Sequence, residues 1–344
     1  MKKQIRMLWI SLLIFITYSS SITAQITNTQ IKGFVDVLGA YQKEKGSFSL
    51  GEQDLFITSD LSDRISFLGE SVFKYSATSP TLFDVSIERV ILKYNYKGNH
   101  NFLAGKHHTP LNYWNDTYHH GRVFFPTIFR PLMFNSGIIP LHTTGISLQG
   151  LNLGKIKFGY DIMVGNGLGS NDVLDNNIYK SLTAAFHIKP VDGLRIGASY
   201  YRDIISSNAI STHLHGGSVN QLSKSLTQEL FSGSIAYFKG KYEFLSEGTM
   251  AINHTDSTGK AQTAIMYAYA GYRIKDKYIP YVRFDWSEYA KNEIYFIKDN
   301  TTSYLIGFRY QINYLAVVKF EYEHSKSARS GMIDKYTAQF AIGF

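Results

Sequence analysis

Apolar and polar residues alternate along most of the chain with a period of two. Between residues 302 and 312, Tyr304, Ile306 and Phe308 share one face of the predicted strand, and Arg309 lies on the other face. Successive side chains of a β-strand point to opposite sides, so this alternation predicts strands whose two faces meet different surroundings. Because the pattern recurs along most of the chain, the sequence predicts an all-β protein.

The alternation divides the chain into about sixteen strands. The predicted strands are 31–42, 49–59, 64–75, 83–96, 101–106, 143–151, 155–165, 179–189, 194–204, 228–238, 241–252, 263–274, 278–288, 302–312, 314–325 and 334–344. Short turns, such as 60–63 and 239–240, follow every second strand. The links between these hairpins, such as 42–48, 253–262 and 326–333, are longer and polar. An even strand number with this asymmetry is typical of a bacterial β-barrel, and 14 or 18 strands are the alternatives.

A soluble β-sandwich would alternate in the same way. Two features favour a transmembrane antiparallel up-and-down barrel over residues 25–344. Aromatic residues make up 15% of the chain and cluster at the ends of the apolar faces, as the girdles of a membrane barrel do. The polar faces carry full charges, which suits a watery lumen. No apolar run after residue 24 is long enough for a spanning helix.

The first 24 residues have the order of a secretory signal peptide. Lys2, Lys3 and Arg6 precede an apolar stretch of about ten residues, and small and polar residues follow up to Ala24. That stretch is shorter than the roughly 20 residues of a spanning helix. Its removal lowers the formal net charge from +8 to +5, because it carries three basic residues and no acidic one. Such a mildly basic chain does not imply a nucleic-acid partner.

The chain ends in a strand with a terminal phenylalanine. Tyr336, Phe340, Ile342 and Phe344 share its apolar face. This arrangement resembles the last strand of Gram-negative outer-membrane barrel proteins, which carries an aromatic residue eight positions before a final Phe and apolar residues four and two before it. The resemblance implies an outer-membrane location, contact with outer-membrane lipid, and recognition of this strand by the barrel-assembly machinery. Cysteine is absent, which excludes disulfides and thiolate ligands.

The longest link, 107–142, contains four of the seven prolines and five of the eleven histidines. A link of this length without regular structure is usually functional. Its beginning, GKHHTPLNYWNDTYHHG at 105–121, resembles a porin-like group near the phosphate-selective porins, whose pattern reads GKxHTPxGYWNxxYHHG. Asn112 replaces a glycine of that pattern. The resemblance implies a loop that folds into the barrel and narrows the pore, as the third loop of general porins does.

Three interpretations of this link remain open. Imidazoles bind zinc, copper or nickel, but the link lacks the HExxH spacing. A catalytic site needs a nucleophile with an oriented base; Thr109, Thr117 and Asp116 are available, without a strained serine turn. The interpretation that we favour is a pore constriction with neither metal nor cofactor. Its candidate residues are His107, His108, Trp114, Asp116, His119, His120, Arg122 and Arg130.

Charged residues at inward positions are candidates for setting ion preference. Basic rows favour anions and carboxylates favour cations. The candidates are Arg64, Glu70, Lys157, Arg195, Arg273, Arg283, Asp285, Arg309, Lys319 and Glu321. The two signs nearly balance, and paired lumen charges without a role in selectivity are the alternative.

The sequence therefore predicts a porin that lets small hydrophilic solutes or ions diffuse passively, with anions such as phosphate among the candidates. A homotrimer is expected only by analogy with porins. The alternatives are a non-conducting barrel with a structural or adhesion role, and an outer-membrane lipid hydrolase. The lipid hydrolase would need Ser and His together on the outer rim, whereas the histidines cluster in one link.

Overall fold

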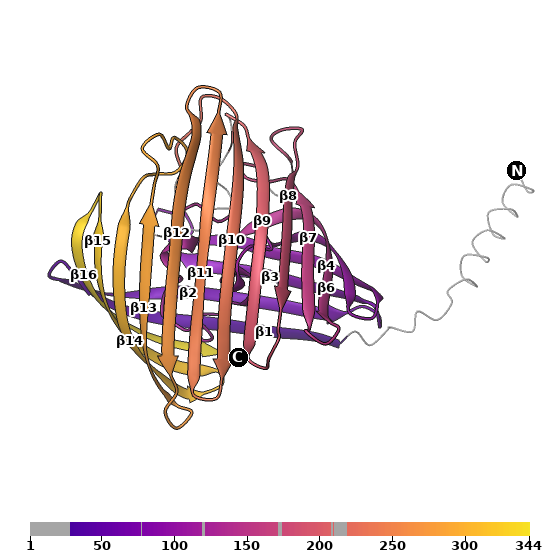
Figure 1. Cartoon of the computed structure of the whole chain (residues 1–344). Coiled ribbons are helices and arrows are strands. Elements are labelled where there is room, and N and C mark those ends of the chain that lie inside the picture. The colour runs from indigo at the N-terminus through magenta and orange to yellow at the C-terminus, as the bar shows by residue number, and fades with distance from the viewer. Residues whose placement is uncertain (1–27, 77, 119–120, 171–173, 208, 210–218) are drawn as a thin grey trace, which may run out of the picture.

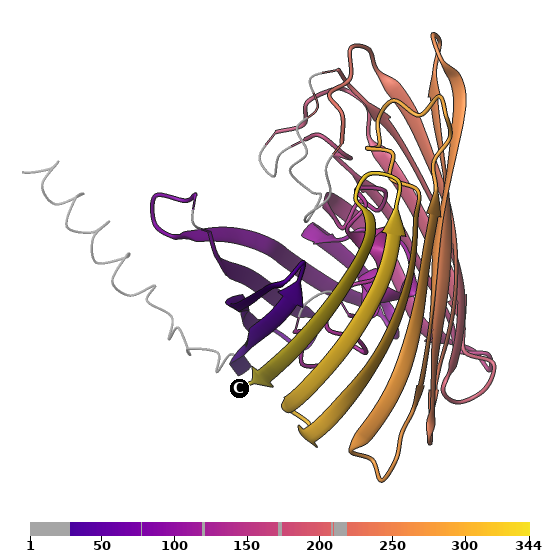
Figure 2. The same cartoon turned by 90° about the vertical axis from the view of Figure 1, so that its left-hand side faces the viewer.

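The strands pair in chain order, and the last strand pairs with the first. The computed structural model describes residues 28–344 except 77, 119–120, 171–173, 208 and 210–218, so the expected signal peptide lies outside the described residues. Within the described residues, sixteen antiparallel strands form a closed barrel (Figure 1). The closing pair joins β1 to β16, with Val37 opposite Phe340, and Figure 2 shows the two strands side by side. The predicted fold and strand number are confirmed.

The bounds of the elements place every strand near its predicted position. The strands are β1 (Asn28–Gln42), β2 (Lys45–Asp60), β3 (Ile65–Tyr75), β4 (Phe83–Lys97), β5 (His100–His108), β6 (His142–Leu153), β7 (Phe158–Gly165), β8 (Ser181–Ile188), β9 (Leu194–Ile205), β10 (Leu226–Lys239), β11 (Tyr242–Thr255), β12 (Gly259–Tyr272), β13 (Tyr278–Glu288), β14 (Thr301–Asn313), β15 (Ala316–Ser327) and β16 (Gly331–Gly343). Between β5 and β6 lie a short α-helix, α2 (Tyr113–Thr117), and a 3-10 turn, η1 (Leu132–Phe134). No helix in the described part of the chain is long and apolar enough to cross a membrane.

Three of the predicted long links are wrong. The links 42–48, 253–262 and 326–333 are short turns, because the flanking strands continue further than their apolar faces do. Lys43 and Glu44 make the first turn with positive φ angles of 50° and 61°, the conformation that two-residue hairpins favour. Strand ends that project beyond an apolar belt meet water on both faces, so they lose the alternation that marks a strand in sequence.

The connections sort to the two ends of the barrel. Because the strands alternate in direction, the turns after β2, β4, β6, β8, β10, β12 and β14 lie at the same end as the start of β1 and the end of β16. We call this the turn end, and the opposite end the loop end. The predicted strand 155–165 begins three residues later than expected, because 154–157 form a turn in which Gly154 and Lys157 have positive φ.

The outer face of the wall is apolar and the inner face is polar. On β16, Phe340 and Tyr336 are about half exposed, whereas Thr337 and Gln339 are buried against the barrel interior. Phe48 on β2 is 92% exposed. An exposed apolar face this extensive calls for a partner or a lipid environment.

The described residues of 109–141, which are 109–118 and 121–141 and which we call the inserted segment, lie inside the barrel. Their side chains form a core with inward-facing side chains of β9–β14. The buried members from the segment are Leu111, Trp114, Phe125, Met133, Phe134, Ile138, Ile139 and Leu141. The entry to this segment depends on Gly105 in β5, whose φ is +125° and whose added Cβ would lie 1.9 Å from the Val90 carbonyl oxygen. Only glycine fits this close approach without strain.

Candidate functional site

A buried carboxylate on β11 holds the start of the inserted segment. Glu247 accepts hydrogen bonds from the backbone N–H groups of Tyr113 and Trp114, the latter at 3.1 Å. The hydroxyl of Tyr267 on β12 donates to the same carboxylate at 2.5 Å. These N–H groups open α2, where no helical partner is available to them. A carboxylate at this position satisfies them and favours the helix dipole.

An ion pair on β13 holds the middle of the segment. Arg283 donates through Nη1 to Thr127 Oγ1 and to the Phe129 carbonyl oxygen, both at 2.9 Å. Its Nε donates to Asp285 Oδ2 at 2.7 Å, and Asp285 Oδ1 accepts the Leu132 N–H at 2.9 Å. Both side chains are buried. The pair therefore grips residues 127–132 at one hydroxyl, one carbonyl and one N–H group.

Charged groups on β14 and β15 continue this contact. Arg309 donates to the Pro126 carbonyl oxygen at 3.1 Å and to Glu243 at 2.7 Å. Lys319 donates to the carbonyl oxygens of Arg122 and Thr127, at 2.6 and 3.1 Å.

Glu321 and Arg273 are the remaining late-strand charges among the candidates. Glu321 accepts the Ile128 N–H at 2.7 Å. Arg273 pairs with Glu243 at 2.7 Å. Most of the late-strand charges expected to line the lumen therefore contact the inserted segment.

The segment also contacts the first strands of the barrel. Arg122 pairs with Glu52 on β2 at 2.8 Å and with Asp36 on β1 at 3.3 Å. The Gly121 N–H donates to Asp54 at 3.0 Å. Burial disfavours the guanidinium charge, but the carboxylates of Glu52 and Asp36 outweigh it and raise the pKa of Arg122. Arg122 is therefore a fixed positive charge beside β1 and β2.

A polar cavity lies between the segment and β2–β4, toward the loop end. Its volume is about 300 Å³. Its charged lining residues are Glu52, Lys74, Asp84, Glu88, Arg122 and Arg130. The cavity carries both signs of charge, and two of its guanidinium groups come from the segment itself.

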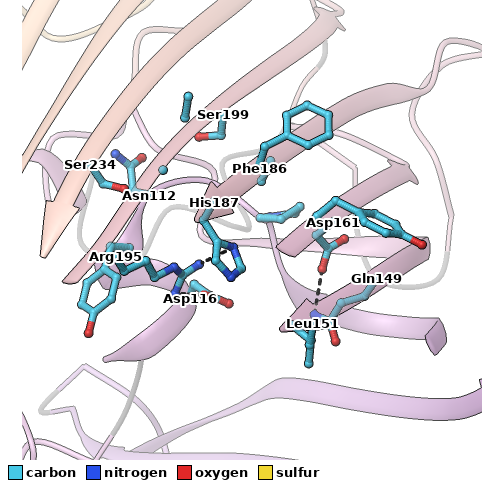
Figure 3. A pocket seen from close by; sticks show the side chains of 16 residues that line it. Asn112, Asp116, Gln149, Leu151, Asp161, Phe186, His187, Arg195, Ser199 and Ser234 are labelled. Carbon is cyan, nitrogen blue, oxygen red and sulfur yellow. Dashed lines mark hydrogen bonds and ion pairs between the residues drawn. The ribbon is translucent and has the colours of Figure 1, made fainter. Parts of the chain in front are cut away.

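Toward the turn end, Arg195 on β9 connects the segment to the opposite side of the wall. It pairs with Asp116 of α2 at 2.6 Å and contacts His187 Nδ1 at 3.2 Å. Its guanidinium lies 5.2 Å from the centre of the Tyr113 ring. Figure 3 shows Arg195, His187 and Asp116 converging beside Asp161, which accepts a hydrogen bond from Gln149.

A second cavity, of about 350 Å³, lies beneath this group at the turn end. We call it the turn-end cavity. Its lining residues are Tyr113, Thr117, Lys157, Lys189, Val191, Asp192, Gly193, Leu194, Arg195, Ala236 and Phe238. The cavity thus combines two side chains of α2 with turns and inward faces of the wall.

The histidines of the opening motif separate in the structure. His107 is buried, and His108 faces His142 across the β5–β6 pair with ring centres 5.5 Å apart. His142 Nδ1 lies 3.3 Å from Glu88 Oε2. His119 and His120 lie outside the described residues. Within the described ranges, no group of three or more His, Asp or Glu side chains is arranged to hold a metal ion.

The remaining candidate residues lie outside these contacts or in the segment core, and several residues of the site were not expected from the sequence. Arg64 and Lys157 lie in turns, and Glu70 pairs with Arg89 of β4. Trp114 is buried in the segment core. Sequence reasoning did not single out Asp36, Glu52, Asp54 or Glu88. The alternation in β1 places Asp36 opposite its apolar neighbours, a signal that could have identified it.

Comparisons with known proteins show the fold of this chain. No family model and no curated protein matches it. Among solved structures, the trimer form of OmpT, an outer membrane protein of Vibrio cholerae, has a TM-score of 0.65 at 12% identity, covering 92% of this chain and 99% of that one. An anion-selective porin from Comamonas acidovorans has a TM-score of 0.65 at 11% identity, covering 92% and 100%. The outer membrane channel DcaP of Acinetobacter baumannii has a TM-score of 0.64 at 12% identity, covering 92% and 97%.

Proposed function

We propose that this protein is an outer-membrane porin that lets small hydrophilic solutes or ions diffuse passively through its lumen. The observation that carries the proposal is the placement of the inserted segment. Charged groups of β11–β15 hold it inside the barrel, and cavities with charged lining residues adjoin it at the loop end and at the turn end. Fixed charges inside a barrel select and orient solutes without any chemical step.

The surroundings of the barrel follow from its two faces. The apolar outer wall contacts outer-membrane lipid, and the exposed face of β16 is the signal for the barrel-assembly machinery. Residues 1–24 act as the signal peptide, and both termini of the barrel stay in the periplasm. The turn end, where β1 begins and β16 ends, therefore faces the periplasm. Homotrimer assembly is part of the proposal, supported by the trimer form of the Vibrio cholerae protein with the same fold.

Planar-bilayer recording tests the proposal. Purified, folded protein is added to one side of a membrane bathed in potassium chloride, and heat-unfolded protein from the same preparation is the control. We expect stepwise conductance increases from the folded sample alone. Folded protein that inserts into the membrane without any conductance would contradict the channel proposal.

The alternative is a non-conducting barrel with a structural or adhesion role. Its supporting observation is that the segment contacts the wall from β1 and β2 around to β15, through residues such as Arg122 and Glu321. Under this alternative, vesicles containing the protein would retain small sugars as well as empty vesicles do. Release of those sugars favours the porin.

A further inference from the structure

The turn end of the barrel carries an excess of positive charge. The turns there, with the strand residues beside them, contain ten basic and four acidic residues. The basic ones are Arg64, Lys97, Lys155, Lys157, Lys189, Lys239, Lys241, Arg273, Lys275 and Lys277, and the acidic ones are Asp60, Asp63, Asp192 and Asp276. This excess of six is one more than the net charge of +5 that remains without residues 1–24, so the other residues of that part carry almost no net charge. A positive rim of this kind raises the local concentration of anions.

Some basic side chains around the turn-end cavity have a carboxylate partner and others do not. Arg195 has a carboxylate partner in Asp116 at 2.6 Å. Asp192, the acidic residue of the lining, pairs with Lys239 at 3.2 Å. Lys189 donates to the neutral Asn152 Oδ1 at 3.0 Å. Within the described part of the chain, neither Lys157 nor Lys189 has a carboxylate partner within 4.0 Å, so the cavity carries two uncompensated positive charges.

The two lysines are close enough to affect each other. Burial, followed by the charges of Arg195 and Lys157, lowers the pKa of Lys189, and Asp116 opposes this effect. Groups that repel in this way gain most from an anion placed between them. Thr117 and Tyr113, which also line the cavity, bear hydroxyl groups that can donate hydrogen bonds to such an anion.

We propose that the turn-end cavity is a binding site for a doubly charged oxyanion, with inorganic phosphate or sulfate as the representative ligand. Lys157 and Lys189 supply the balancing charge, Arg195 closes the site on the side of β9, and α2 forms its inner boundary. The site makes the permeant class anionic, and in that respect it rests on the proposed porin function. Of the charges that the sequence marks as candidates for setting ion preference, the site contains Lys157 and Arg195, and it adds Lys189.

Equilibrium binding to the folded protein in detergent tests the site without requiring conductance. The probes are inorganic phosphate and sulfate, measured by calorimetry in potassium chloride at about 0.15 M ionic strength, where exposed charges are screened beyond about 8 Å. Hydrogen bonds to charged groups contribute more than about a tenfold change in affinity each. We therefore expect the Lys157→Gln/Lys189→Gln variant to bind both probes at least about tenfold more weakly than the unmodified protein.

A matched control removes two charges from the same rim but not from the cavity. Lys155 lies in the same turn as Lys157, Lys241 lies in the neighbouring β10–β11 turn, and both are exposed and outside the lining. The Lys155→Gln/Lys241→Gln variant should retain phosphate affinity within about twofold, since charges at an exposed rim are screened. Equal losses in both variants would mean a diffuse positive field, and absence of phosphate and sulfate binding to the unmodified protein would overturn the site.

Reversal potentials in a salt gradient separate this inference from the proposed function. We expect the Lys157→Gln/Lys189→Gln variant to lose anion preference while it still conducts. A protein that conducts but binds neither probe contradicts the site and leaves the porin in place. A protein that binds phosphate but does not conduct contradicts the porin and leaves the site in place.

Discussion

Replacement of Arg283 by methionine should release the inserted segment from the wall. The change removes the hydrogen bonds to Thr127 and Phe129 and leaves Asp285 buried without its cation. Breaking a buried ion pair in this way costs about 3–5 kcal/mol. At 1.4 kcal/mol per factor of ten, the equilibrium between the docked and the released segment shifts by more than about a hundredfold.

The absence of cysteine from the chain gives a direct assay. Ile128 is fully buried and lies between Thr127 and Phe129, the two residues that Arg283 holds. An Ile128→Cys variant therefore carries one thiol that reacts only when the segment is released. The labelling rate with a water-soluble maleimide should rise by about the same factor in the Arg283→Met background. Arg329→Met, at an exposed turn of the loop end, should leave the rate unchanged.

Two results would refute this reasoning. If Arg283→Met changes the reversal potential but not the labelling rate, Arg283 acts as a filter and not as an anchor. The Arg283→Met/Asp285→Asn variant gives the second check. Its neutral amide removes the unpaired charge and still accepts the Leu132 N–H, so it should label more slowly than the single variant. Equal rates would show that the unpaired carboxylate is not the source of the cost.

Three further outcomes follow from the structure. Gly105→Ala should lower the temperature at which the barrel unfolds on a heat-modifiability gel, because the added Cβ meets a carbonyl oxygen at 1.9 Å, whereas Gly248→Ala, with its nearest atom at 3.7 Å, should not. Trp114→Ala should destabilise the docked segment by about 3–5 kcal/mol, seen as faster labelling of the Ile128→Cys thiol. Sulfate affinity should fall as the pH rises through the lowered pKa of Lys189, because the lysine is charged only below that pKa. A Lys189→Gln variant should lack this alkaline step.

The strands could be predicted because lipid and lumen impose opposite demands on the two faces of each strand. Tyr304 and Ile306 are exposed on the outer wall and Arg309 is buried inside, as the alternation indicates. The length of the 107–142 link indicated that it has a role beyond joining two strands. The true extents of β2, β12 and β16 could not, since their outer ends are surrounded by water and carry no periodic signal.

Sequence patterns could not show, for a different reason, which wall residues hold the inserted segment. Alternation assigns Arg283 to the interior, but it cannot show that the Phe129 carbonyl, 154 residues earlier in the chain, fills the space before it. An inward charge facing open water and an inward charge facing a docked backbone have the same pattern. Only the path of the link distinguishes them, and that path depends on packing around Trp114 and Phe134.

Side chains of the wall hold the inserted segment largely by hydrogen bonds to its backbone atoms. Arg309, Lys319 and Glu321 contact carbonyl oxygens or N–H groups of residues 122–128 and do not depend on which side chains those residues carry. Substitutions at exposed side chains of the segment can therefore accumulate without releasing it from the wall. If the proposed porin function holds, changes in solute selectivity are separated from the constraints that keep the barrel folded, and a library randomised at exposed segment positions is a practical route to new permeants.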